Sequence, residues 1–259
     1  MLSVEKINGK RIAWYIGLTF ALTYLMWGIL ALNPGGLLPL SGVLGVIIFI
    51  IGGNAPPIVV LFLLLKWREI TGLKEYFRRI VRTEYGARRA IWVTALFFLV
   101  EIGLVAIMEK RTAQPLYMFI PIFLLTVMGG GLEEVGWRGF LQRGMEKKLP
   151  FWLAAPAVGL IWAFWHIPLW FIAGTSNSTF SYLYFVLFCV TNSYVLAALR
   201  KISGSVLPCI LFHMLINTLG SFFVITDVFL GKDLPLLLAY VLQAILAVAL
   251  VYLQRRKSQ

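Results

Sequence analysis

Two histidines are the residues of this chain most suited to chemistry, because both interrupt long apolar stretches. They are the only histidines among 259 residues. Trp162 precedes His166 by four residues, and Asn217 follows His213 by four, so each pair would share one face of a helix. Ionisable groups inside a bilayer are costly and usually serve a function. With the glutamate pair described next, these side chains point to water activation and oxyanion binding rather than to ion conduction.

A pair of adjacent glutamates follows three glycines in a third apolar stretch. Glu134 and Arg138 are four residues apart, which predicts an ion pair on a helix and neutralises one carboxylate. Glu133 is turned about 100° away and is left to face another group, where it could accept and return a proton. The glycines at 129–131 would permit close helix approach or a local break. The alternative is a purely structural ion cluster near a helix end.

Each histidine also has a structural alternative, namely hydrogen bonding between helices. Pro168 removes a backbone hydrogen bond just after His166 and is expected to bend that helix around a cavity. A neutral imidazole at His213 and the carboxamide of Asn217 can both donate to a developing oxyanion. Because both histidines of the chain accompany a glutamate pair, a functional site is the favoured interpretation.

The elements that must position these residues are membrane helices. Apolar residues make up 60% of the chain and charged residues 13%, whereas soluble domains average about 45–50% and about 25%. The apolar runs are long and continuous, which excludes an outer-membrane barrel. We therefore predict an all-α, polytopic membrane helix bundle that forms a single domain over residues 1–259. Its eight expected spans are 12–32, 41–65, 90–108, 116–137, 151–172, 180–199, 204–225 and 234–253.

The net charge of +12 follows membrane topology rather than a nucleic-acid footprint. With the N-terminus inside, 19 Lys and Arg residues fall in the segments expected inside and 3 in those expected outside. This asymmetry predicts a multi-pass protein of the cell membrane with both termini cytoplasmic, in contact with the lipid bilayer. The basic segment 66–89 has apolar residues at helical spacing, which predicts an interfacial amphipathic helix: Leu73, Phe77, Ile80 and Val81. Cys189 and Cys209 lie inside expected spans and are interpreted as core residues, without a disulfide.

The expected depths bring the motifs together. Glu133 lies about 25 Å from the outer end of its segment, and His213 about 14 Å from the inner end of its own, at about 1.5 Å per residue. Both would then occupy the cytoplasmic half of the bilayer. We therefore expect one shared cavity that opens to the cytoplasm.

Three motifs in this order resemble the CPBP intramembrane proteases, a family that includes type II CAAX prenyl endopeptidases and bacterial Abi-type bacteriocin-immunity proteins. The motifs are Glu-Glu-x-x-x-Arg at 133–138, aromatic-x-x-x-His at 162–166 and His-x-x-x-Asn at 213–217. The resemblance covers about residues 116–220, the expected catalytic core. Trp162 departs from it, since the family more often has Phe there.

The resemblance implies roles for these residues. Glu133 and His166 would activate the attacking water, His213 and Asn217 would bind the oxyanion, and Glu134, Arg138 and Trp162 would support the site. If a metal is present, Glu133, His166 and His213 could hold Zn²⁺ with an open position. Since H-E-x-x-H is absent and Asn is a poor zinc ligand, water activated by the glutamate without a metal is favoured.

The resemblance implies a peptide or protein substrate. Two other functions stay open at this stage: a non-proteolytic immunity or regulatory protein, and a small transporter that uses the Glu and His residues as a proton relay. The sequence gives no prediction of the oligomeric state or of whether the substrate is prenylated.

Overall fold

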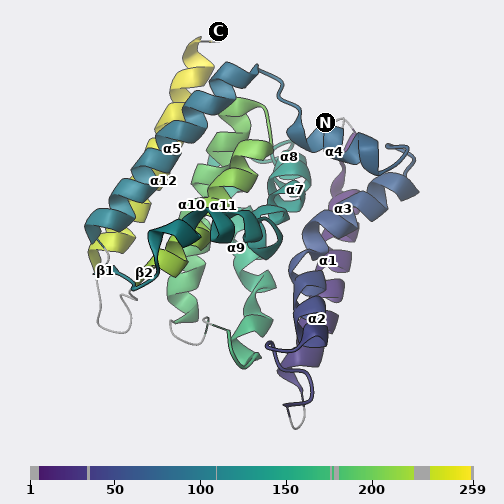
Figure 1. The fold of residues 1–259 in the computed structure, drawn as a ribbon. Helices are drawn as coiled ribbons and strands as arrows, with labels where there is room; N and C mark the ends of the chain where they lie inside the picture. Colours follow the sequence, from purple (N-terminus) through teal and green to yellow (C-terminus); the bar gives the residue numbers. More distant parts are fainter. Residues whose placement is uncertain are drawn as a thin grey trace.

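The computed structural model of the chain describes residues 6–33, 36–108, 110–175, 177, 181–224 and 234–257. The fold is an all-α bundle, as predicted, and all eight expected apolar segments are helical (Figure 1). The first half contains α1 (Gly9–Ala31), α2 (Val43–Gly53), α3 (Ala55–Lys66), α4 (Leu73–Val81) and α5 (Ala87–Met108). Two short strands, β1 (Lys110–Arg111) and β2 (Phe223–Val224), pair antiparallel between α5 and the end of α11 (Leu207–Phe222).

The segment after β1 is broken into short helical pieces. They are η3 (Leu116–Met118), α6 (Phe119–Leu125), η4 (Val127–Gly131), α7 (Glu133–Gly136), η5 (Trp137–Leu141) and α8 (Gln142–Met145). The remaining elements are α9 (Phe151–Trp165), η6 (Ile167–Phe171), α10 (Tyr182–Ser203), α11 and α12 (Leu234–Lys257). Long α10 is capped at its start by the Ser181 hydroxyl, which accepts from Tyr184 N–H at 3.2 Å, and ends at Gly204 in the left-handed conformation.

Five single helices of the described chain are long and apolar enough to cross a membrane, and seven spans result if each bent pair counts as one. The bent pairs are α2 with α3, at 60°, and Leu116–Leu125 with Val127–Met145, at 53°. The eighth segment, α11, has only 16 residues and is shorter than the roughly 20 that cross a bilayer. The protein is a multi-pass membrane protein with fewer full-length single spans than the eight predicted.

The helices form two groups around a central pair. In Figure 1, α1, α2 and α3 stand on one side, α5 and α12 stand together on the other, and α10 and α11 lie between them. Helix α10 packs against α9, α12 and α5, while α7 packs against α3. The motif-bearing helices are therefore enclosed by both groups.

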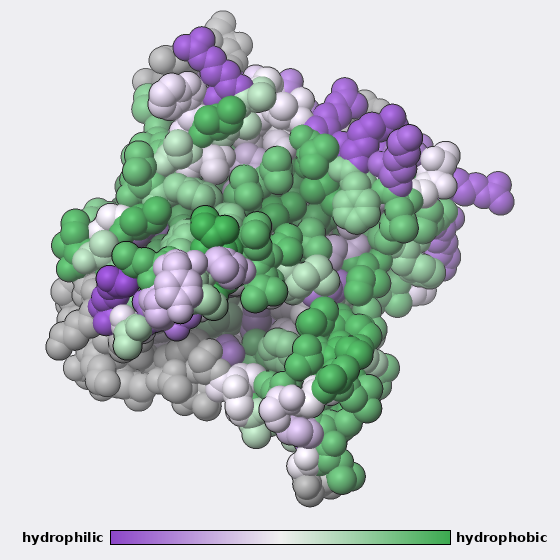
Figure 2. Space-filling model, in the orientation of Figure 1, coloured by the Kyte–Doolittle hydropathy of each residue, from purple (hydrophilic) through white to green (hydrophobic). Residues whose placement is uncertain are grey.

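The surface divides into apolar sides and a charged end. Charged side chains gather at the end of the bundle where α4 lies, and large apolar side chains cover its flanks (Figure 2). The start of α1 and the end of α12 lie toward that same end (Figure 1). Helix α4 buries Tyr76 and Ile80 but exposes Leu73, Phe77 and Val81, which suits the predicted interfacial helix. The cytoplasmic location of this end stays a prediction from the charge asymmetry.

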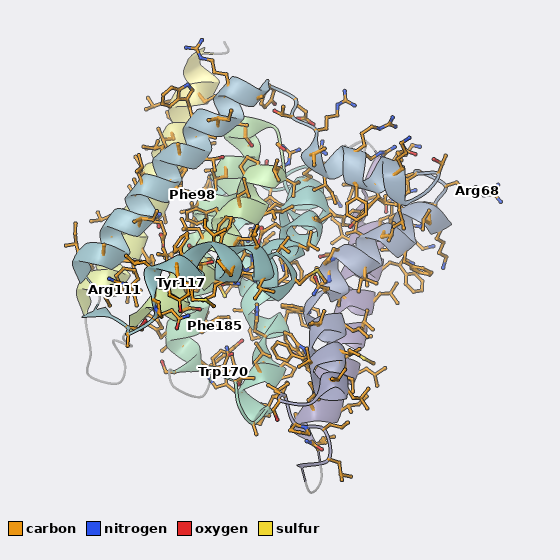
Figure 3. All side chains as sticks on the ribbon, in the orientation of Figure 1. Arg68, Phe98, Arg111, Tyr117, Trp170 and Phe185 are labelled. Carbon is orange, nitrogen blue, oxygen red and sulfur yellow. The ribbon has the colours of Figure 1, made fainter. Side chains whose placement is uncertain are left out.

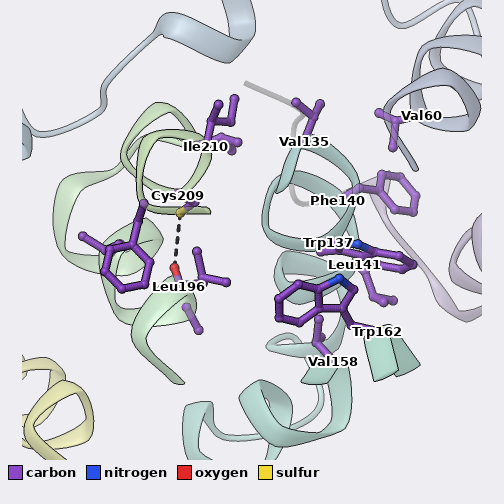
Figure 4. Close-up of a cluster of buried hydrophobic side chains, with 14 of the residues drawn as sticks. Val60, Val135, Trp137, Phe140, Leu141, Val158, Trp162, Leu196, Cys209 and Ile210 are labelled. Atoms are coloured by element: carbon purple, nitrogen blue, oxygen red, sulfur yellow. Dashed lines mark hydrogen bonds between the residues drawn. The ribbon is translucent and has the colours of Figure 1, made fainter. Parts of the chain in front are cut away.

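The core beside the motifs is aromatic. Trp137, Phe140 and Leu141 pack next to Trp162 and are almost fully buried (Figure 4). Both cysteines are buried and free, as predicted, and Cys209 Sγ donates to the Leu196 carbonyl at 3.2 Å. This tight packing fixes the indole rings that contact the glutamate pair.

Candidate active site

The glycine triplet breaks its helix and so presents the two glutamates. Gly129 and Gly130 have non-helical backbone angles, and Gly130 adopts φ 142°, a conformation that L side chains rarely adopt. The break frees backbone carbonyls, which side-chain amides satisfy from opposite sides. Asn54 Nδ2 donates to the Met128 carbonyl at 2.8 Å, and Asn217 Nδ2 donates to the Gly129 carbonyl at 2.7 Å. The new helix, α7, begins at Glu133.

Glu134 joins two of the sequence motifs. Its Oε2 accepts from Arg138 Nε at 2.9 Å, which confirms the predicted ion pair, and both side chains are fully buried. Its Oε1 accepts from His213 Nδ1 at 2.9 Å, a contact that the sequence did not predict. Arg138 Nη1 also donates to Ser193 Oγ at 2.6 Å, and that hydroxyl donates to the Ala155 carbonyl. Arg138 thereby ties α10 and α9 to the glutamate pair.

Glu133 is held by two indole rings. Its Oε2 accepts from Trp162 Nε1 at 2.9 Å and from Trp137 Nε1 at 3.3 Å. Among the described residues, Oε1 accepts no hydrogen bond. Phe at position 162 could pack similarly but has no N–H to donate, so the departure of this chain at Trp162 gives Glu133 an additional donor. The carboxylate is thus fixed by one oxygen while the other is left for a ligand.

His166 is oriented by the same tryptophan. The helix α9 ends at Trp165, and η6 continues it through Pro168, where the backbone changes to a tighter helix. His166 Nδ1 lies 2.9 Å from the Trp162 carbonyl, which only accepts, so Nδ1 carries the hydrogen. Nε2 of the neutral ring therefore keeps its lone pair. The ring of Phe185, labelled with Trp170 in Figure 3, packs edge-on against the imidazole at 5.0 Å.

His213 and Asn217 lie beside the glycine break. A Cβ atom added to Gly130 would lie 2.7 Å from His213 Nε2 and would also collide with Asn217 Nδ2. Because His213 Nδ1 donates to Glu134, a neutral ring would have only a lone pair at Nε2. In this tautomer a neutral His213 cannot donate from Nε2, so the predicted donation to an oxyanion requires the imidazolium, and it stays a prediction. Asn217 keeps a second N–H beyond its bond to Gly129.

One cavity brings the predicted residues together. Its volume is about 560 Å³, and its walls include Glu133, Trp162, His166, His213 and Asn217. Glu134 and Arg138 are not among the lining residues and act from behind His213. The predicted convergence of three motifs on one cavity is confirmed.

The direction of this cavity bears on topology. Its lining reaches Asn177, Ser221 and Phe223, near β2 and the segment after η6, whereas α4 lies at the opposite end of the bundle (Figure 1). The expected opening to the cytoplasm and the expected cytoplasmic location of α4 and the termini therefore exclude each other. The expected depths assumed a straight rise of about 1.5 Å per residue, whereas Glu133 follows a bend of 53° between Leu116–Leu125 and Val127–Met145, so the side to which the cavity opens stays a prediction.

Comparison with known proteins agrees with this geometry. Residues 114–219 match the family model of type II CAAX prenyl endopeptidase Rce1-like proteins. This part of the chain is therefore similar to the Rce1-like proteins. It is also 24% identical over 243 residues to CAAX prenyl protease 2 of Methanococcus maripaludis, covering 84% of this chain and 85% of that protein. The matched segment runs from just before η3 into the last turn of α11 and contains all three motifs, so the comparisons support a membrane protease.

The cavity does not offer a ready metal site. Among the described residues, no group of three His, Cys, Asp or Glu side chains is arranged to hold a metal ion. Glu133 Oε1, His166 Nε2 and His213 Nε2 are not used by the hydrogen bonds that hold these side chains. Because the three side chains are not gathered into one metal-binding group, the set Glu133, His166 and His213 does not fit zinc in this arrangement, and we derive no step through a metal.

Three residues that contact the site were not predicted from the sequence. Trp137 donates to Glu133 from four residues away, a spacing that could have revealed it. Glu101 is buried in α5 and lines the cavity. An acidic residue inside an apolar span could have indicated that it is functional. Asn54 reaches the glycine break from 74 residues away, and no local pattern indicates that contact.

Proposed function

We propose that this chain is an intramembrane endopeptidase, similar to the CAAX prenyl endopeptidases, which hydrolyses a peptide bond of a peptide or membrane-protein substrate in the Glu133 cavity. The observation that carries the proposal is the pairing of Glu133 and His166 through Trp162. The indole N–H of Trp162 fixes the carboxylate, and its backbone carbonyl fixes the imidazole. Each group thereby keeps one basic atom without a hydrogen-bond donor among the described residues.

In the proposed reaction, a water molecule between these groups attacks the scissile carbonyl carbon. Glu133 takes the water proton as the C–O bond forms, and His166 Nε2 orients the water through its lone pair. The carbonyl oxygen becomes an oxyanion, to which Asn217 Nδ2 and protonated His213 Nε2 donate. Glu133 then gives its proton to the amide nitrogen, the C–N bond breaks, and the products are a carboxylic acid and an amine, which become a carboxylate and an ammonium when the acid proton passes to the amine.

The charges of the supporting residues suit this sequence. The Glu134 carboxylate accepts from His213 Nδ1 and favours the imidazolium form that the oxyanion needs. Arg138 balances the second negative charge of the glutamate pair, so that Glu133 and Glu134 can both be ionised so close together. Glu134 is thus a positioning residue for His213.

The test compares Glu133→Gln with wild type, both reconstituted in lipid vesicles with quenched fluorescent peptides, prenylated and unmodified. We expect Glu133→Gln to lose at least about 10²-fold in cleavage rate, because a carboxamide cannot accept the water proton. Thermal unfolding should stay unchanged, since Gln can still accept from both indoles. The control is Glu75→Gln on exposed α4, which should retain full activity.

Two results would contradict the proposal. If Glu133→Gln cleaves peptides as fast as wild type, Glu133 is not the general base. If wild type cleaves no peptide and its cellular function survives Glu133→Gln, the protein is an immunity or regulatory protein. Elemental analysis of the active sample tests the reaction without metal. If the active sample holds one zinc per chain, and both zinc and activity are lost on chelation and restored by adding zinc, the reaction depends on zinc and the mechanism without a metal is wrong.

A further inference from the structure

Glu101 is a second carboxylate of the cavity that the proposed reaction does not use. It lies in α5, is 1% exposed and forms part of the cavity wall with Val105 one turn later. Its Oε2 accepts from Gln243 Nε2 of α12 at 3.0 Å. Among the described residues it has no cationic partner, and Gln243 is its hydrogen-bond donor.

This environment differs from that of Glu134, whose charge Arg138 balances directly. A carboxylate buried in a membrane segment is costly unless a cation pairs with it. The amide of Gln243 orients Glu101 but carries no charge to cancel it. Together with Glu133, two carboxyl groups that have no Lys or Arg partner among the described residues face one cavity, and an incoming cation would favour the ionised form of Glu101.

The neighbouring side chains suit an organic cation. Tyr240 lies one helical turn before Gln243 on α12 and also lines the cavity. Its ring packs edge-on against Phe188 of α10 at 5.5 Å, and Phe188 is another lining residue. Aromatic rings beside a carboxylate bind ammonium and guanidinium groups through combined ion-pair and cation–π attraction. A hydrated metal ion would instead need several oxygen ligands, which this wall does not gather among the described residues.

We infer that Glu101 forms a specificity subsite that binds a basic side chain, lysine or arginine, of the peptide substrate. The inference rests on the proposed function, because the subsite shares its cavity with Glu133 and His166. Glu101 contacts the substrate away from the scissile bond and takes no part in proton transfer. Binding of the cation there would hold the peptide across the cavity and select which bond reaches Glu133.

The experiment uses full-length protein in vesicles and peptide pairs that differ at one position, with lysine or its uncharged analogue norleucine. The position is moved along the peptide on both sides of the cleaved bond. At one position wild type should prefer lysine by about 10- to 100-fold in kcat/KM, the range expected for a desolvated ion pair. Glu101→Gln should remove this preference and leave cleavage of the norleucine peptide within threefold of wild type. Glu75→Gln, the same change outside the cavity, should keep the preference.

Glu101→Asp is the second variant and retains the charge. Glu101→Asp should prefer lysine more strongly than Glu101→Gln does. Its shorter side chain should also weaken the lysine preference relative to wild type, so Glu101→Asp alone can test the subsite if Glu101→Gln fails to fold. Equal cleavage of lysine and norleucine peptides by wild type at every position overturns the subsite, while the protease function stands. A uniform loss on all peptides in Glu101→Gln, or an unchanged preference in either folded variant, also overturns it. Absence of any cleavage by wild type overturns the proposed function itself.

Discussion

The two broken spans of this protein break in different ways and contribute differently to the site. The α2–α3 span bends by 60° at Asn54, where Pro56 and Pro57 follow and lack backbone N–H groups. The second span bends by 53° at the glycine triplet, where Gly130 adopts a positive φ. Proline makes the first break by removing donors, whereas glycine makes the second by permitting a conformation that other residues rarely adopt. Only the second break is followed by acidic residues.

The two breaks also depend on each other. The carbonyls freed at the glycine break are satisfied by Asn54 from the first break and by Asn217 from α11. Further along, a Cβ on Gly136 would collide with the Tyr15 hydroxyl and lie 2.7 Å from Pro56 Cβ, so α7 packs directly on the start of α3. Irregular backbone at membrane depth is tolerated where neighbouring protein groups satisfy it. The motif-free half of the chain therefore supports the geometry of the motif-bearing half.

The largest effect is expected from substituting the glycine whose conformation defines the second break. Gly130→Ala would strain the backbone at φ 142° and place a methyl group against Asn217 Nδ2 and His213 Nε2. We expect cleavage to fall by about 10³-fold or more, because the oxyanion groups are displaced. Gly129→Ala is the matched control, since its Cβ would meet nothing within 4 Å and its φ is −94°. Peptide cleavage rates of the two variants measure the difference, and equal losses would show that the break is not specific to Gly130.

A smaller effect is expected from the amide on the α11 side of the break. Asn217→Ala removes a proposed oxyanion donor together with the bond to the Gly129 carbonyl. Loss of one such donor costs about 10² to 10³ in kcat with little change in KM. Steady-state kinetics on the same peptides measure this split. A rise in KM with unchanged kcat would instead make Asn217 a residue for substrate binding.

The sequence predicted the parts of this arrangement that depend on local spacing. The Glu134–Arg138 pair follows from a four-residue separation on a helix, and the apolar segments follow from composition. The cavity shared by Glu133, His166 and His213 was predicted from the expected depths of the motifs along their helices. Each of these inferences needs only the properties of one helix or of one residue type.

The remaining parts depend on where distant helices meet. The bond from Glu134 to His213 spans 79 residues, and that from Gln243 to Glu101 spans 142. No periodicity relates such residues, so neither the tautomer of His213 nor the environment of Glu101 could be predicted. The prediction that the cavity opens to the cytoplasm assumed straight helices, whereas two of the spans are bent by 60° and 53°.

The smallest effect is expected from the amide on the α2–α3 side. Asn54 Nδ2 donates to its own helix at the Ile50 carbonyl, 2.9 Å away, and across to Met128 at 2.8 Å. Asn54→Ala leaves the Met128 carbonyl without this donor, which should lower the free energy of unfolding by about 0.5–1.5 kcal/mol, the net worth of a typical hydrogen bond. Since Asn217 still holds the Gly129 carbonyl, cleavage per folded molecule should fall only about tenfold.

The matched control is Asn192→Ala in α10. Asn192 is 1% exposed, and its Nδ2 donates to the Phe188 carbonyl of the same helix at 3.0 Å. Its loss should lower the thermal unfolding temperature to a similar extent but leave cleavage per folded molecule within twofold of wild type. Equal loss of cleavage in both variants would reduce Asn54 to a general stabilising residue. A loss confined to Asn54→Ala would show that the break at Asn54 positions the glycine break through the hydrogen bond to the Met128 carbonyl.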